Sequence, residues 1–197
     1  MGKLFAKIYD IMMQPLEQKG LTELRKNLIR NARGKVLEIG SGTGLNFPFY
    51  ERADKVIAIE PQPLMMNRSL IRANDALVPI DVVLADAEEI PFQDNTFDTV
   101  VGTLVLCTIP NPLKTLEEIR RVCKPHGTIL FLEHVRLDRP ILGRIQDWLT
   151  PIWKHVCDGC HLNRKTVELI NKVGFKLVRK KQYCKNLLLE IELLNSK

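Results

Sequence analysis

The sequence has no long apolar segment, few aromatic side chains and an odd number of cysteines. No apolar run approaches the roughly 18–20 residues that a membrane span needs, and no secretory signal opens the chain. Aromatic residues make up only 6% of the chain and form no aromatic–basic RNA-binding motif. Five cysteines without an export signal argue against a disulfide framework. We therefore expect a cytoplasmic protein.

What remains is the composition of one ordinary globular domain. The chain has 197 residues, of which 45% are hydrophobic and 26% charged, so disordered, collagen-like and fibrous classes are excluded. A chain of this length can bury a sizeable core. We expect a single domain over residues 1–197.

The formal net charge of +6 is unevenly distributed. Residues 1–34 carry 7 basic and 3 acidic side chains, residues 35–133 carry 9 and 14, and residues 134–197 carry 13 and 6. Two basic ends therefore flank an acidic middle. This pattern fits either ordinary solvated lysines or an anionic partner such as a lipid surface.

Apolar strand signals alternate with helix signals through the middle of the chain. The predicted strands are 36–39, 56–59, 80–84, 97–102 and 128–132. The predicted helices are 4–13, ended by Pro15, then one from Leu21 to near Gly34, then 62–74 and 112–123. Residues 125–127 are predicted to form a turn. This alternation implies parallel crossovers and an α/β, doubly wound sheet.

The pattern changes after residue 134. Residues 140–153 and 163–173 are predicted to be helices, and residues 175–179 and 187–194 are predicted to be strands. The short link between these two strands favours an antiparallel pair. We expect residues 1–34 to form a helical lid, residues 35–133 a ligand-binding core, and residues 134–197 a substrate-side insertion and a terminal hairpin.

The strongest motif is a glycine-rich turn between a strand and a helix, Glu38-Ile39-Gly40-Ser41-Gly42-Thr43-Gly44. Glycine lets the backbone approach a ligand closely. The dinucleotide-binding fingerprint would need glycine where this chain has Leu45. A carboxylate at Glu38 would repel a pyrophosphate and suits a cationic ligand group.

Two further acidic positions follow successive strands. Glu60 ends the second strand, where a carboxylate can accept both hydroxyls of a ribose. Asp86, followed by Ala87, comes after the third strand, where it can accept from an adenine amine. Open α/β sheets bind ligands at these carboxyl ends.

This ordered set, together with Lys124-Pro125-His126-Gly127 before the fifth strand, resembles the class I S-adenosylmethionine-dependent methyltransferases over residues 35–133. The resemblance implies a seven-stranded sheet with the last strand antiparallel, and S-adenosylmethionine as cofactor. The family usually has two glycines after the proline, where this chain has His126-Gly127. The cofactor-binding residues that we expect are Tyr9, Glu38, Gly40, Ser41, Gly42, Gly44, Asn46, Glu60, Pro61, Asp86, Ala87, Thr103 and Leu104.

A narrower resemblance is to the methyltransferase-like 7 group of membrane-associated alkyl-thiol methyltransferases. It is carried by residues 103–107, 132–135, 153–155 and 158–160. The group's amino-terminal hydrophobic anchor has no counterpart in this sequence. A thiol is therefore our first expectation for the acceptor, and a phospholipid amine or a quinone ring is the second.

Three residues are predicted to work on the acceptor side. His134 follows the fifth strand and could take a proton from a nucleophile. His155 and Asp158 belong to a loop that we expect to line the pocket. Cys107, after the fourth strand, is expected to be a packing residue, and Tyr9 to belong to the lid.

A zinc interpretation of Cys157 and Cys160, flanked by His155 and His161, has little support in the sequence. A structural zinc site usually draws two ligand pairs from separated segments, and no second pair of this spacing exists here. We therefore expect no metal.

Methyl transfer is the function that these motifs favour. Residues 102–105 do not match the motif of amino-DNA and amino-RNA methyltransferases, so no nucleic-acid substrate is expected. The alternatives are a nucleotide-binding oxidoreductase, which Leu45 and Glu38 disfavour, and a non-catalytic nucleic-acid-binding protein acting through its basic ends. Peripheral membrane contact is compatible with those ends. The oligomeric state stays open.

Overall fold

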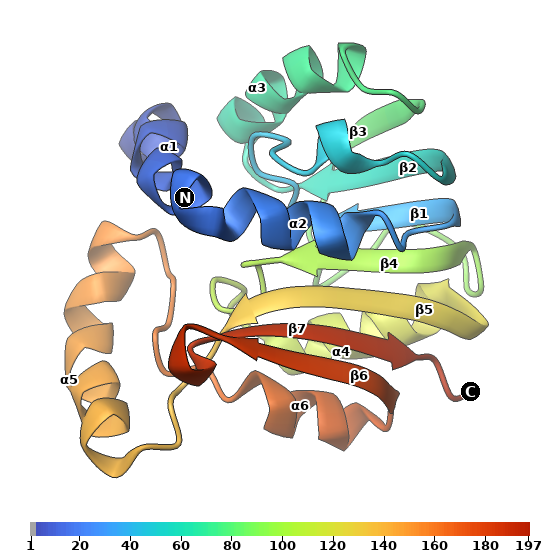
Figure 1. The fold of residues 1–197 in the computed structure, drawn as a ribbon. Helices are drawn as coiled ribbons and strands as arrows, with labels where there is room; N and C mark the ends of the chain where they lie inside the picture. The colour runs from blue at the N-terminus through green and yellow to red at the C-terminus, as the bar shows by residue number, and fades with distance from the viewer. Residues whose placement is uncertain (1–2) are drawn as a thin grey trace.

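One seven-stranded sheet forms the centre of the computed structural model, which describes residues 3–197 (Figure 1). The strands are β1 (Gly34–Ile39), β2 (Ala53–Glu60), β3 (Ile80–Leu84), β4 (Phe97–Thr103), β5 (Cys123–His134), β6 (Lys176–Tyr183) and β7 (Leu188–Leu194). Their order is β3-β2-β1-β4-β5-β7-β6. The first five strands run parallel, and β7 runs antiparallel to both β5 and β6. The predicted doubly wound sheet with an antiparallel last strand is confirmed.

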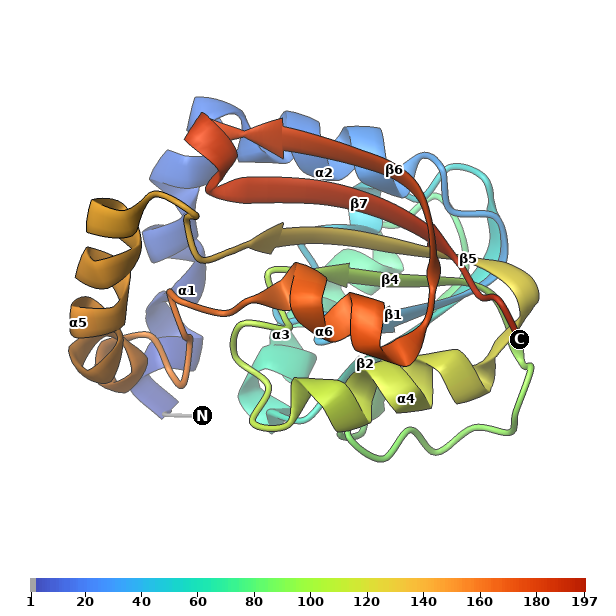
Figure 2. The ribbon, with the colours of Figure 1, turned by 90° about the horizontal axis from the view of Figure 1, so that it is seen from below.

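Helices cover both faces of this sheet. They are α1 (Lys3–Leu16), α2 (Thr22–Ile29), α3 (Pro63–Asn74), α4 (Pro112–Val122), α5 (Pro140–Val156) and α6 (Thr166–Val173). Short helical turns lie at Glu17–Leu21, Phe47–Phe49 and Cys184–Asn186. Figure 2 shows α2 on the opposite side of the sheet from α4 and α6. The buried apolar side chains accordingly form two clusters, one on each face.

The central strands are apolar because both of their faces are covered. Val36, Leu37 and Ile39 of β1 are all fully buried, as are Val100 and Val101 of β4. Such continuous apolar runs are typical of parallel strands packed between helices. The carboxyl ends of the parallel strands therefore meet at one edge, and α1 and α5 lie beyond that edge (Figures 1 and 2).

The amino-terminal helices differ from the prediction. Pro15 lies inside α1 and does not end it. As the next-to-last residue, it removes only one hydrogen bond, to the carbonyl of Ile11 on an exposed turn. The chain changes direction at Gly20 instead, where φ is 114°. The second helix ends at Ile29, and Gly34 already begins β1.

Residues 125–127 lie within β5 rather than in a separate turn. His126 has a φ of 61°, and the register with β4 shifts between Phe97 and Thr99, so the segment forms a bulge. The backbone N–H of His126 donates to the carbonyl of Asn195, and that of Asn195 donates to the carbonyl of Gly127, both at 2.9 Å. Pairing with the carboxyl-terminal residues thus keeps this segment in the sheet.

Among residues 3–197, no helix is both long enough and apolar enough to cross a bilayer.

Replacing Gly20 tests whether the turn between α1 and α2 is set by backbone conformation. A Cβ there would meet no atom within 4 Å, so Gly20→Ala costs only the positive φ. We expect the free energy of unfolding to fall by about 1–2 kcal/mol in urea titrations. The exposed neighbour Lys19 has ordinary helical geometry, so Lys19→Ala should stay within about 0.5 kcal/mol of the parent. Equal stability of Gly20→Ala and the parent would contradict this account.

Candidate active site

The glycine-rich loop follows β1 at the carboxyl edge of the sheet. Gly40, Gly42 and Gly44 have positive φ values of 59°, 58° and 81°, which other residues adopt only at a cost. A Cβ on Gly40 would lie 2.2 Å from a methyl carbon of Val105, and a Cβ on Gly44 would also clash. A Cβ on Gly42 would meet only the ring of Tyr9, at 4.0 Å. Gly40 and Gly44 therefore permit close packing, and Gly42 is the glycine with room beside it.

Two polar groups at this loop are suited to a polar ligand. The hydroxyl of Ser41 is buried and has no hydrogen-bond partner among the described residues. Glu60, the last residue of β2, accepts hydrogen bonds from the backbone N–H of Gly42 at 2.9 Å and of Gln62 at 3.0 Å. Burial raises the pKa of Glu60, although those two hydrogen bonds oppose the shift. An unsatisfied buried hydroxyl costs about 1–3 kcal/mol, which a ligand at Ser41 would recover.

A buried polar network connects α2 with the two central strands beneath the loop. One guanidinium nitrogen of Arg25 donates to Asn46 at 3.1 Å and to Thr103 at 2.8 Å. Asn46 donates to Glu38 at 3.0 Å, and the hydroxyl of Tyr50 donates to Glu38 at 2.6 Å. Burial raises the pKa of Glu38 to about 7, against the lowering effect of Tyr50 and Asn46. Three of the predicted cofactor residues (Glu38, Asn46 and Thr103) thus bond to protein groups below the loop.

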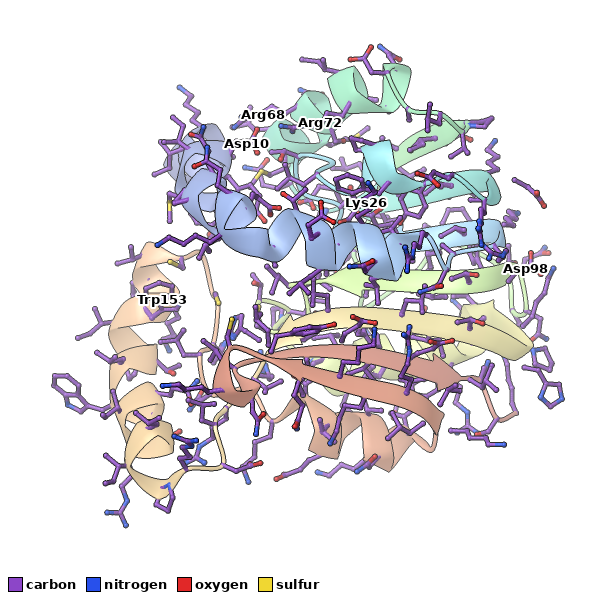
Figure 3. The ribbon with its side chains drawn as sticks, viewed as in Figure 1. Asp10, Lys26, Arg68, Arg72, Asp98 and Trp153 are labelled. Carbon is purple, nitrogen blue, oxygen red and sulfur yellow. The ribbon has the colours of Figure 1, made fainter. Side chains whose placement is uncertain are left out.

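Asp10 attaches α1 to the loop and to α3. Its carboxylate accepts hydrogen bonds from Thr43 at 2.6 Å, Arg68 at 2.7 Å and Arg72 at 3.0 Å. Figure 3 shows Asp10 beside these two arginines. Burial opposes ionisation, but the hydrogen bonds from Thr43 and Arg72 still lower the pKa of Asp10. This contact holds Tyr9, the residue before Asp10 in α1, beside the open glycine, Gly42.

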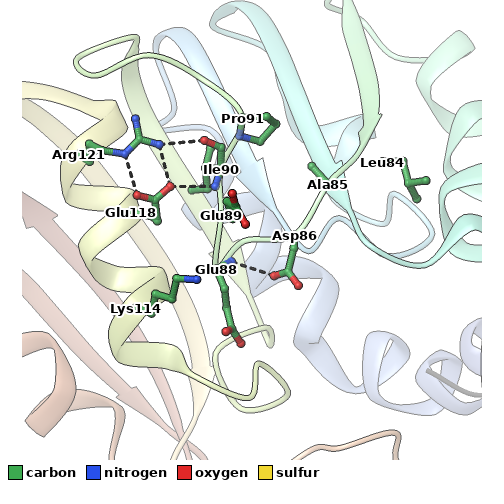
Figure 4. Close-up of a pocket in the computed structure, with 10 residues that line it drawn as sticks. All are labelled: Leu84, Ala85, Asp86, Glu88, Glu89, Ile90, Pro91, Lys114, Glu118 and Arg121. Atoms are coloured by element: carbon green, nitrogen blue, oxygen red, sulfur yellow. Dashed lines mark hydrogen bonds and ion pairs between the residues drawn. The ribbon is translucent and has the colours of Figure 1, made fainter.

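Asp86 and Ala87 lie in the turn after β3, as the motif predicts. Asp86 is exposed and accepts from the backbone N–H of Glu88 at 2.8 Å, and Ala87 is buried. Asp86 lines a hollow of about 810 Å³ whose far wall is the ion pair of Glu118 with Arg121 on α4 (Figure 4). None of the residues that line this hollow belongs to the glycine loop. The hollow therefore adjoins the candidate site only at Asp86.

Pro61 and Leu104 follow β2 and β4 at the same edge of the sheet. Pro61 is exposed. Leu104 has a φ of 54°, which is uncommon for a residue with a branched side chain, and its N–H donates to the carbonyl of Leu132 at 2.7 Å. The turn after β4 is therefore held by its neighbour β5.

Sulfur and imidazole groups gather at the ends of β4 and β5. The Nε2 atom of His134 lies 3.1 Å from the sulfur of Cys160, which lies 3.7 Å from the sulfur of Cys107. Cys107, followed by His134, lowers the pKa of Cys160 to about 4. Below them Glu133 is fully buried, and its Oε1 accepts from the backbone N–H groups of Val105 and Leu106. Burial raises the pKa of Glu133 to about 7.

The other two predicted catalytic residues are placed differently. His155 is exposed on α5, and its Nδ1 lies 2.6 Å from the carbonyl oxygen of Pro151. His155 is thus an exposed residue that contacts the backbone of its own helix, and its place in the pocket stays a prediction. Asp158 has a φ of 52° in the loop before Cys160, and its charge contributes to the raised pKa of Glu60. Asp158 therefore lies toward the glycine loop.

The two halves of the site adjoin each other. The pKa of Tyr9 is raised mainly by burial, and Cys107 is near enough to add to that shift. Tyr9 also lies beside Gly42. The segment of α1 that covers the glycine loop is thus also close to the sulfur-containing cluster.

Sequence reasoning missed the residues that hold this site together. Arg25 lies at helical spacing from Leu21 and Leu28, on the apolar face of its helix. Its position in the sequence could therefore have predicted that this charged side chain is buried. Asp10 and Tyr50 had no comparable signal, because their partners are distant in sequence. Such partners are known only once the chain is folded.

The strand order, the glycine loop after β1 and the acidic residues after β2 and β3 define the class I methyltransferase fold. A family described as "Methyltransferase domain" matches residues 37–131. A putative methyltransferase from Bacillus halodurans has a similar structure, with a TM-score of 0.73 at 14% identity over 91% of this chain and 100% of that chain.

Two curated relatives show to which family this chain belongs. Thiol S-methyltransferase TMT1B of Rattus norvegicus is 37% identical over 150 residues, 73% of this chain and 61% of that protein. Thiol S-methyltransferase TMT1A of Homo sapiens is 30% identical over 179 residues, 89% of this chain and 73% of that protein. The chain therefore belongs to the methyltransferase family that contains these thiol S-methyltransferases. It spans about three fifths of the length of the rat relative.

Removing the charge of Asp10 tests its attachment of α1. Asp10→Asn keeps the shape but loses the ion pairs with Arg68 and Arg72, which are 35% and 31% exposed. We expect the α1 amides to exchange with deuterium about tenfold faster at pH 7, measured by mass spectrometry. In the parent, the lowered pKa of Asp10 means that this protection is present at neutral pH and is lost as the pH falls through that pKa.

The matched control is Asp81→Asn, which removes an exposed ion pair with Lys55 on the sheet. It should leave exchange in α1 unchanged. Equal exchange of α1 in Asp10→Asn and the parent would show that Asp10 does not hold the helix.

Proposed function

We propose that this chain is an S-adenosylmethionine-dependent methyltransferase acting on a small or lipid-like acceptor, with a hydrophobic thiol as the first candidate. The observation that carries the proposal is the unpartnered, buried hydroxyl of Ser41 beside Glu60. Both groups lie at the strand ends where open α/β sheets bind ligands. The activities of the thiol S-methyltransferase relatives support the choice of acceptor.

The residues present fit the proposed cofactor. Ser41 and Gly42 would hold its amino-acid part, Glu60 would accept the ribose hydroxyls, and Asp86 with Ala87 would border the adenine. Each oxygen of Glu60 accepts one backbone hydrogen bond and keeps further acceptor capacity. The bound cofactor supplies an electrophilic methyl carbon, so the protein mainly has to align the acceptor and exclude water.

The remaining roles follow from position. Residues 1–34 act as a lid whose described part packs Tyr9 against the loop, residues 35–133 form the cofactor-binding core, and residues 134–197 form the acceptor side. His134 is the candidate proton acceptor, and Asp158 lies between the acceptor side and the glycine loop. We propose no direct role for His155, because its side chain is exposed.

Replacing Glu60 tests the cofactor site. Glu60→Gln removes the charge that favours the ribose hydroxyls, so affinity for S-adenosylhomocysteine should fall by at least about tenfold in isothermal titration. Transfer of labelled methyl groups to a thiol, a phospholipid and a quinone should fall in parallel. Glu51→Gln is the control, since Glu51 is an exposed carboxylate in the loop before β2.

Two outcomes would contradict the proposal. Folded parent protein that does not bind S-adenosylhomocysteine at millimolar concentration would refute the cofactor assignment. Binding accompanied by only background methylation of all three acceptors would refute the acceptor class. Preferred methylation of the thiol is the expected result.

A lipid-like acceptor is favoured by the exposed surface of α5, which stands apart from the sheet (Figure 1). This apolar face consists of Ile141, Leu142, Ile145, Trp148, Leu149, Ile152, Trp153 and Val156, each at least 37% exposed. The same helix carries Arg144 and Lys154. Apolar residues beside basic ones favour peripheral binding to an anionic membrane surface, and we propose cytoplasmic localisation at such a surface. The similarity to a phosphatidylethanolamine N-methyltransferase of Cereibacter sphaeroides, 34% identical over 119 residues, supports a phospholipid as the alternative acceptor.

Placing acidic residues on this face tests membrane contact. Ile145 and Trp148 are 46% and 73% exposed, so replacing both with Glu should leave the fold intact. We expect binding to phosphatidylserine-containing vesicles to fall at least about tenfold in flotation assays, because each side chain contributes about 1.5–3 kcal/mol when buried in lipid. Leu77→Glu alters an equally exposed residue before β3 and should have little effect. Equal flotation of both variants would contradict the assignment.

A further inference from the structure

Three metal-capable side chains converge from three separated segments of the chain. Cys107 follows β4, His134 ends β5, and Cys160 follows α5. Their two sulfur atoms and one imidazole nitrogen all lie within 4.8 Å of one another. Cys107 is buried, and the other two residues are partly buried. The sulfur of Cys107 also donates to the carbonyl of Leu104 at 3.4 Å and lies 3.6 Å from the hydroxyl of Thr108.

We propose that Cys107, His134 and Cys160 bind one zinc ion, leaving a fourth coordination position open for a thiol ligand. Two cysteines and one histidine with an open position form a ligand set that catalytic zinc uses. In the sequence, only Cys157 and Cys160 of one loop with their flanking histidines suggest a metal, and none is expected there because no second ligand pair of this spacing exists. Folding supplies the missing ligands from the ends of two strands.

Two of the three distances between the ligand atoms are close to those of tetrahedral zinc. Sulfur atoms about 2.3 Å from one ion at the tetrahedral angle are about 3.8 Å apart, and the two sulfurs here are 3.7 Å apart. A sulfur and a nitrogen around the same ion are about 3.5 Å apart, compared with 3.1 Å between Cys160 and His134. Two of the three ligand–ligand distances therefore match tetrahedral zinc to within about 0.4 Å. The third, between Cys107 and His134, is at most 4.8 Å, so these two side chains would have to approach each other to close the site.

The charges and ligand types also favour zinc. Two thiolates and a neutral imidazole balance the double positive charge of the ion, which removes the cost of burying unpaired sulfur anions. Thiolates select soft or borderline ions such as zinc over magnesium or calcium. Glu133 lies directly below but uses one oxygen to bind Val105 and Leu106, so it supports the turn that carries Cys107.

The open position would place an acceptor next to the glycine loop. The loop that ends at Cys160 brings Asp158 near Glu60, and Tyr9 lies near both Cys107 and Gly42. A thiol bound to zinc would lose its proton to solvent and become a nucleophilic thiolate. In the zinc-bound protein His134 would thus serve as a ligand, and the metal would replace it as the group that promotes deprotonation. Its sulfur then forms a bond to the methyl carbon, the carbon–sulfonium bond breaks, and the electron pair stays on the former sulfonium sulfur. This role rests on the proposed function, whereas metal binding does not.

Metal titration tests the site without measuring activity. The reduced protein should bind about one zinc per chain, and cobalt in its place should give the thiolate charge-transfer and tetrahedral absorption bands. Cys160→Ser and His134→Gln should weaken metal binding at least about tenfold. Cys157→Ser, from the same loop, and the exposed Cys184→Ser should bind as the parent does. Cys160→His should retain the metal, which separates loss of a ligand from loss of the fold.

The outcomes distinguish this proposal from the proposed function. A parent that binds no zinc under reducing conditions, or forms only a disulfide between Cys107 and Cys160, would overturn the zinc site. Equal binding by Cys160→Ser and Cys157→Ser would also overturn it. A shift of the cobalt spectrum on adding a small alkyl thiol is expected, and an unchanged spectrum would overturn the open-position role. S-adenosylhomocysteine binding, measured separately on each variant, reports on the proposed function alone.

Discussion

The glycine loop keeps its place through one buried interaction, the hydrogen bonds that Arg25 donates to Asn46 and Thr103. Arg25 is 3% exposed and also pairs with Glu17 at 2.9 Å. A buried guanidinium is costly unless its donors are satisfied, so α2, the end of β4 and the helical turn after the loop must fit together. Glu38 joins the same network through Asn46. The position of the glycine loop, on the cofactor side of the site, therefore depends on this buried network.

The acceptor side depends on an equally local constraint. Glu133 is fully buried, and its hydrogen bonds to Val105 and Leu106 hold the turn after β4 against β5. Leu104 accepts a left-handed conformation within that turn. Cys107 is consequently fixed beside His134, although 27 residues separate them in the sequence. A rigid scaffold with reactive groups on its connecting turns is a common arrangement in α/β enzymes.

Much of the fold was readable from periodicity and turn residues. Apolar runs marked the central parallel strands, because strands covered on both faces need such runs. The edge strand β6 is largely exposed and basic, so the prediction of residues 175–179 covered only its first part. One error has a local physical cause and one has a long-range cause. Pro15 is tolerated near the end of α1, where only one hydrogen bond is lost. Residues 125–127 stay in β5 because Asn195 pairs with them. No local pattern could reveal a partner about 70 residues away.

The sequence determined the alternation of strands and helices, the glycine loop and the acidic residues at the strand ends, because each depends on local spacing or on rules for short connections. Tertiary structure decided which groups meet. It exposed His155, buried Glu38 against Tyr50, and brought Cys107 and His134 to Cys160. These contacts join segments that are far apart in the chain. Their geometry follows from packing of the whole domain, which no local sequence pattern encodes.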